Sequence, residues 1–361
     1  MINSNHPNMT PNRIIPLLLL FLFGLNSCVI TDNIRTLQVE VMKPGVFDIP
    51  KDLSVAVINR NLFRSDTCTF YYSTGYYRLW DTTKDTTVKY HANYNMVKDT
   101  SIKYADLSDT CVNELVNYFE EENYFRKVIN YGDSLNFLLN APGSIATRDE
   151  LFEKTKADVC IFLDYFHLNT TFNGYFPNPY VTKANLIWTV AFKTDSLVYS
   201  YNLADTLFYD LEQVLAYSKY KDKILGQLIN NSSKYLGRSF GTKVIPSWMP
   251  VERIYYKSRN TEMIKAEKYA LNQDWLKAAE IWNRETKNKN DKIKAKACYN
   301  MALACEMEGK PDAAIDWLVK SYSSLGKNNE EHKANCQRYV TVLALRKKEI
   351  ERLEKQVKNQ E

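Results

Sequence analysis

The chain has 361 residues, of which 45% are hydrophobic and 25% are charged, and its formal net charge is +5 at pH 7. This length and composition are typical of a globular protein with about two domains and a sizeable core. The small basic excess is spread along the predicted C-terminal helices, as on solvated helix faces. The charge therefore excludes a concentrated basic surface, and we expect no nucleic-acid partner.

The N-terminal segment predicts where the protein is found. Residues 14–25 form an apolar run that is shorter than the roughly 20 residues needed to span a bilayer, and Asn26, Ser27 and Cys28 follow it. This arrangement resembles a bacterial lipoprotein signal. It predicts a signal peptide over residues 1–27, lipid attachment at Cys28 and a tether over residues 28–48. The alternatives are a buried N-terminal helix and an uncleaved anchor with an incidental cysteine.

The remaining cysteines, histidines and serines form no recognisable catalytic or metal-binding pattern. The sequence contains no CxxC, HExxH, GxGxxG or phosphate-binding loop motif. Residues 237–241 match GxSxG around Ser239, but they follow a long predicted helix and not a strand, so they do not predict the nucleophile turn of a hydrolase. We therefore predict no catalytic residue, no metal, no cofactor and no enzyme activity. Cys68 and Cys111 are the one pair of cysteines that we consider for a disulfide, because an oxidising compartment would permit it.

Residues 49–250 predict an α/β sandwich domain with a mixed sheet. Short apolar, β-branched runs alternate with helical patterns, and a Tyr/Thr-rich insertion covers residues 63–105. Asp109 is the expected N-cap of the first helix, and Gly237 and Gly241 are expected to follow the end of the last one. The predicted strands cover residues 53–60, 125–129, 157–163, 184–192 and 197–205, and the predicted helices cover residues 109–119, 147–156 and 211–236.

Residues 259–361 predict an all-α domain of paired helices. The stretch 295–318 resembles a tetratricopeptide repeat of about 34 residues, and a poorer copy precedes it by 36 residues. In this family small residues are needed where two helices cross closely. The corresponding packing positions here are Ala302, Gly309 and Ala314 in the second copy, and Ala266, Ala278 and Trp282 in the first. A capping helix ends the domain, and an unrelated helical bundle is the alternative.

Taken together, these features resemble a Bacteroidetes lipoprotein family with an N-terminal α/β domain and C-terminal tetratricopeptide repeats. The resemblance rests on the segment that ends at Cys28, the strand 55–60 and the turn 245–248. It implies a lipid-anchored protein of the cell envelope, in the outer membrane. Residues 29–32 lack an acidic run associated with surface export, which favours the periplasmic side.

Aromatic side chains gather in two predicted loop regions. Residues 70–80 include six aromatics, and residues 175–180 lie in a segment rich in Gly and Pro. Loop aromatics can stack on sugars or anchor a protein partner, although alternate members of such a run can also fill a sheet core. The candidate ligand-binding aromatics are Tyr76, Tyr77, Trp80, Tyr175 and Tyr180.

Two functions are compatible with this sequence. The first is a non-enzymatic scaffold that binds another protein on the concave surface of its repeats. The alternative is an outer-membrane lipoprotein that binds glycans through its loop aromatics. Both involve a membrane, through the lipid anchor.

Overall fold

The structure is a computed structural model that describes residues 34–61, 64–73, 96–132, 148–172, 180–209, 224–325 and 329–357. The chain divides into two compact units. The helical unit comprises Met1–Lys43 and Trp248–Glu351, and the α/β unit comprises Pro44–Ser247 and Arg352–Glu361. The expected mixed class is confirmed, since a sheet precedes a run of helices. Each unit, however, combines two segments, in contrast to the continuous domains 49–250 and 259–361 expected from the sequence.

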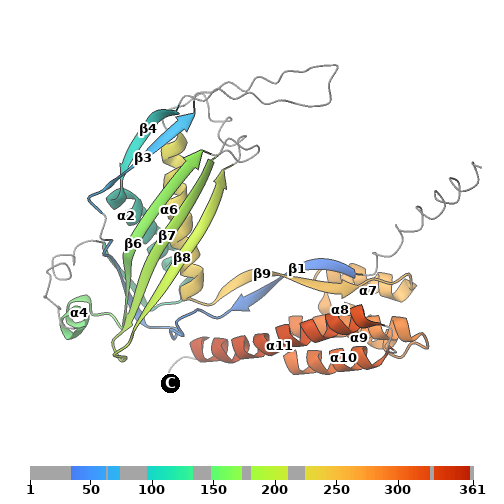
Figure 1. The fold of residues 1–361 in the computed structure, drawn as a ribbon. Helices are drawn as coiled ribbons and strands as arrows, with labels where there is room; N and C mark the ends of the chain where they lie inside the picture. Colours follow the sequence, from blue (N-terminus) through green and yellow to red (C-terminus); the bar gives the residue numbers. More distant parts are fainter. Residues whose placement is uncertain are drawn as a thin grey trace, which may run out of the picture. The chain divides into compact units, whose positions relative to one another are not determined.

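A five-stranded mixed sheet organises the α/β unit (Figure 1). Strand β2 is parallel to its neighbours β5 and β6, whereas β6, β7 and β8 are antiparallel in sequence order. The strands, in the order of the sheet, are β5 (Lys127–Gly132), β2 (Ser54–Asn59), β6 (Val159–Phe172), β7 (Tyr180–Phe192) and β8 (Val198–Tyr209).

Helices cover the two faces of this sheet unequally. Helices α2 (Tyr104–Glu122) and α6 (Ile224–Val244) cover one face, where the main core of the unit forms (Figure 1). Within this core the Trp188 ring stacks on Phe240 at 4.3 Å between centroids. Helix α4 (Arg148–Thr155) adds a smaller apolar cluster with β2 and β6. Every residue of β2 is therefore buried, whereas β8 alternates between buried or half-buried and exposed residues along much of its length.

Two glycines allow α2 and α6 to pack closely. A Cβ atom at Gly237 would lie 2.1 Å from the carbonyl oxygen of Cys111, and one at Gly241 would lie 2.3 Å from the Tyr118 ring. Neither position can accept a larger side chain without movement of a helix. The expectation that these glycines follow the helix is therefore wrong, because α6 continues through both to Val244. The two glycines instead leave room for α2 to pack against α6.

The predicted cap of α2 is also wrong. The helix begins at Tyr104, and Asp109 lies inside it. The Asp109 carboxylate accepts hydrogen bonds from Asn59 Nδ2 at 2.6 Å and from two Arg64 nitrogens at 2.7 and 2.9 Å. Asp109 therefore ties the end of β2 to the helix. Cys111, in the next turn, is a free and buried thiol, so the disulfide that we considered with Cys68 is absent.

Strands β3 (Thr67–Ser73) and β4 (Met96–Lys103) form a separate antiparallel pair in the insertion. The middle of this insertion, residues 74–95, lies outside the described residues. The end of α11 closes the α/β unit: the Gln356 amide accepts a hydrogen bond from the Gly45 N–H and donates one to the Gly45 carbonyl, both at 3.0 Å.

In its described residues, the helical unit combines a two-stranded sheet with five helices. Strand β1 lies within the segment 28–48, which was expected to be a tether; that expectation is wrong because β1 pairs with β9. Among the described residues, no helix has the length and apolar character needed to cross a bilayer. The elements are β1 (Ile34–Lys43), β9 (Ser247–Tyr256), α7 (Thr261–Leu271), α8 (Trp275–Glu285), α9 (Asp291–Met307), α10 (Pro311–Ser323) and α11 (Glu330–Val357).

Candidate functional site: a groove in the helical unit that holds strand β9

Strand β9 is bound to helix α9 through its main chain. The Tyr256 N–H donates to Asn300 Oδ1 at 2.8 Å, and Asn300 Nδ2 donates to the Tyr256 carbonyl at 2.9 Å. Asn300 is buried, and its amide carries one acceptor and a donor group side by side. This pair recognises an extended backbone whatever the side chain of the bound residue.

A buried ion pair fixes the strand a short distance away. Arg253 donates to both carboxylate oxygens of Glu306 at 2.9 and 2.7 Å, and the Tyr339 hydroxyl donates to the same carboxylate at 2.6 Å. The two ionised side chains are only 11% and 1% exposed. Burial opposes the charge of Arg253, but the hydrogen bonds and charge of Glu306 outweigh it and raise the pKa of the guanidinium. Burial, with the charge of Glu306, raises the pKa of Tyr339 well above its usual value.

The aromatic end of β9 completes the attachment. The Tyr256 ring meets the Tyr299 ring edge-on, with centroids 4.9 Å apart, and its hydroxyl accepts a hydrogen bond from Asn335 Nδ2 at 2.8 Å. Burial raises the pKa of Tyr256 to about 12. The neighbouring Tyr255 hydroxyl donates to Glu267 of α7 at 2.8 Å. Helices α7, α9 and α11 thus hold one strand by its backbone, its charge and its rings.

A pocket of about 200 Å³ lies open beside β9. It is smaller than the roughly 300–1,000 Å³ of sites for drug-sized ligands, so its size fits one protein side chain better than a small molecule. Two exposed apolar residues of α11, Val342 in the pocket wall and Leu345 one turn further, extend its apolar surface. The lining residues are Glu252, Arg253, Ile254, Tyr299, Asn335, Arg338, Tyr339 and Val342.

A cysteine and a histidine also meet in this unit. His332 Nε2 lies 2.9 Å from Ser321 Oγ and 3.6 Å from Cys336 Sγ. Burial raises the pKa of the Cys336 thiol to about 11 and lowers the pKa of His332. A nucleophilic cysteine needs the opposite shift of its thiol, so this trio is a neutral, packed hydrogen-bond cluster.

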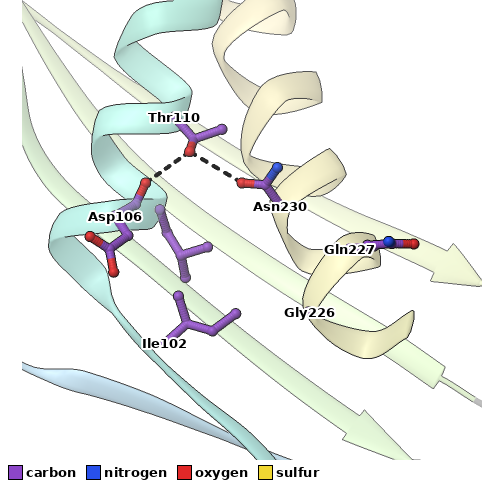
Figure 2. Close-up of a pocket in the computed structure, with 7 residues that line it drawn as sticks. Ile102, Asp106, Thr110, Gly226, Gln227 and Asn230 are labelled. Carbon is purple, nitrogen blue, oxygen red and sulfur yellow. Dashed lines mark hydrogen bonds between the residues drawn. The ribbon is translucent and has the colours of Figure 1, made fainter. Parts of the chain in front are cut away.

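The α/β unit has a second pocket, of about 410 Å³, between α2, α6 and the end of β4 (Figure 2). The Thr110 hydroxyl donates to the Asp106 carbonyl at 2.8 Å and lies 3.2 Å from Asn230 Oδ1, and so links the two helices (Figure 2). Ile102 and Leu107 give the pocket an apolar part, and polar side chains surround it. No group of three metal-ligating side chains occurs in the part of the chain that the structure describes.

The structure places the six predicted packing residues inside or between the helical hairpins. Gly309 directly follows the C-cap of α9 and has a φ of 70°, a conformation that suits glycine. The other five side chains are fully buried: Ala266, Ala278 and Trp282 in one apolar cluster, and Ala302 and Ala314 in the next.

Most of the other predicted site residues lie outside the described residues. This holds for Cys28 and for Tyr76, Tyr77, Trp80 and Tyr175. Tyr180 is the first residue of β7, where it stands opposite Phe172 and Tyr209 in the sheet. The grouping of the candidate aromatics therefore stays a prediction.

The groove residues were missed by sequence reasoning, although a signal was present. Asn300 and Glu306 are the two polar residues in the otherwise apolar stretch 297–307 of α9. A polar residue in such a stretch needs a buried partner. The sequence does not show that the partner is a strand that precedes the helices.

These features define a protein of mixed α+β class in which a helical unit holds an extended strand of its own chain. Residues 53–256, more than half of the chain, match the family model described as domain of unknown function DUF8603, and the chain belongs to this family. Residues 264–345 match a second model, domain of unknown function DUF6340, which covers most of the helical hairpins. No curated protein matches the chain.

Proposed function

We propose that this protein is a lipid-anchored scaffold of the cell envelope that binds another protein through its helical unit without catalysing a reaction. One observation carries the proposal: Asn300 pairs with both backbone groups of Tyr256. A surface that recognises main-chain groups and side-chain rings is suited to polypeptide ligands.

The helical hairpins support a likeness to tetratricopeptide repeats. The hairpins α7–α8 and α9–α10 place small residues at equivalent positions 36 residues apart, as in Ala266 and Ala302. In such repeats the first helix of each pair lines the concave surface. Here β9 is bound to α9 through Asn300, so we expect a partner to meet the pocket beside β9.

The proposed contact surface is the pocket beside β9 together with Val342 and Leu345 of α11. Leu345 is 57% exposed, and the pocket behind Val342 has room for one apolar side chain. An apolar anchor that fills a pocket is the usual centre of a protein interface. We place this surface on the periplasmic side of the outer membrane, tethered through the lipid on Cys28.

Photo-crosslinking in intact cells tests this contact. A photoreactive residue at Leu345 of the full chain should capture a reproducible protein adduct, and Val342→Lys should abolish it by placing a charge at the pocket. The matched control is Leu276 on α8, which is 62% exposed and does not line the pocket. The same adduct from Leu276, or no adduct from Leu345, would contradict the proposal.

A separate experiment tests the anchor. Cys28→Ala should leave the signal peptide uncut and prevent the incorporation of labelled fatty acid into the protein. Unchanged processing and unchanged labelling would rule out lipid attachment at Cys28.

A further inference from the structure

Strand β8 forms an unusually open edge of the five-stranded sheet. It is 12 residues long and pairs with β7 from Val198 to Tyr209 without a register shift. No strand among the described residues pairs with its outer edge. Natural proteins usually protect such edges with lysines, prolines or bulges, and β8 has none of these. The opposite edge strand, β5, is only 6 residues long and has an irregular register with β2.

Large apolar side chains are exposed near both ends of this strand. Val198 is 61% exposed and Phe208 is 63% exposed. Both belong to the set of alternate residues that point away from the core, because Leu203 between them points into it. Asp205 is the one charged residue of β8, so electrostatic repulsion does not protect the edge either.

We propose that β8 pairs antiparallel with β8 of a second copy of this chain, in a register centred on Leu203. Val198 and Phe208 are equally distant from Leu203, so this register places each Val198 directly opposite Phe208 of the second copy. On the outward face Val198 then lies opposite Phe208 and Ser200 opposite Thr206, while Asn202 lies opposite Ala204. On the other face Tyr199 lies opposite Leu207 and Tyr201 opposite Asp205.

Neighbouring registers lose this match. A centre at Ala204 keeps the faces aligned but sets the polar Ser200 against Phe208. Because the Leu203 register is symmetric, each apolar pair forms twice and both open edges are consumed in one closed dimer. The pairing joins two five-stranded sheets into one continuous sheet, and it is independent of the groove in the helical unit.

Charged residues introduced at the facing positions 198 and 208 test the proposal. The full chain in mild detergent should sediment as a dimer, and Val198→Lys or Phe208→Glu should each weaken dimerisation by about tenfold or more. The double variant V198K/F208E should restore it, because each new ammonium then faces a new carboxylate. Both positions are exposed, so the variants should fold normally. Leu276→Lys, at a similarly exposed site on α8, is the control and should not alter dimerisation.

Cysteine crosslinking tests the register. A mixture of the Ser200→Cys and Thr206→Cys variants should form a crosslink, whereas neither variant alone should, because identical positions lie about 20 Å apart along the paired strands. A monomeric wild type, a dimer that resists the single charge variants, failure of the double variant to restore dimerisation, or crosslinking by one cysteine variant alone would each overturn the proposal.

Discussion

The strength with which β9 is attached can be measured by removing the charge from the buried ion pair between Arg253 and Glu306. Glu306→Gln preserves the shape of the side chain but removes its charge. The guanidinium, 11% exposed, would then face a neutral amide whose NH₂ group cannot accept its hydrogen bond. Tyr339 would lose its charged acceptor as well.

We expect the destabilisation caused by Glu306→Gln to lie at the lower end of the range known for broken buried ion pairs. Removal of one partner from a buried ion pair destabilises a protein by about 3–5 kcal/mol. Arg253 keeps one hydrogen bond, from Nη1 to the Glu252 carbonyl at 3.0 Å, and it keeps some contact with water. We therefore expect about 3 kcal/mol for Glu306→Gln.

Hydrogen exchange followed by mass spectrometry is the appropriate assay, because it reports on β9 separately from the α/β unit. A loss of about 3 kcal/mol corresponds to exchange of the Tyr256 amide that is faster by about 150-fold. Glu252→Gln, at the neighbouring residue of β9, should leave this exchange rate almost unchanged. Arg253→Met combined with Glu306→Gln should recover part of the loss, since no unpaired charge remains buried. Exchange within about threefold of the wild type in Glu306→Gln would refute the reasoning.

Three further predictions concern the packing and the buried polar groups. Gly237→Ala should destabilise the α/β unit by about 1–3 kcal/mol through overpacking, whereas Gly226→Ala in the same helix, with free space around it, should stabilise it by up to about 1 kcal/mol in urea unfolding. His332 has a lowered pKa through burial, so its neutral ring contributes stability above about pH 6.5 that is lost as the pH falls below this value. His332→Asn should flatten this part of the stability profile between pH 5 and 7, and an unchanged profile would contradict the assignment. Gln356→Ala should leave the Gly45 N–H without its partner, while the Gly45 carbonyl keeps its hydrogen bond from Arg352 at 2.8 Å; we expect a cost of about 1–3 kcal/mol, detected as faster exchange of the Gly45 amide.

Local sequence patterns predicted elements well where the residues themselves determine the structure. The apolar, β-branched run at residues 53–60 predicted β2, and the alanines at the predicted packing positions, such as Ala302, are buried. The break between the predicted strands 184–192 and 197–205 matches the break between β7 and β8. In each case the burial pattern follows directly from the periodicity of neighbouring residues.

The errors all involve partners that are distant in the sequence. Strand β1 resembles a polar tether because its partner, β9, lies more than two hundred residues later. Asp109 resembles a helix cap until Arg64 and Asn59 reach it from the end of β2 and the segment that follows. Gly237 resembles a helix stop because the group that requires a glycine there, the Cys111 carbonyl, lies on another helix. For the groove, the polar residues of α9 were visible, but the strand that they bind was not.

The division of each unit into two chain segments has a consequence for synthesis. The helical unit needs β1 from the start of the described chain and α11 from its end, and the α/β unit needs Gln356 beside Gly45. Neither unit is therefore complete until α11 has left the ribosome, so the order of translation does not separate their folding in time. A fragment of residues 259–361, however natural it looks in the sequence, lacks both β1 and β9 and would expose the buried side chains of Asn300 and Glu306 to water.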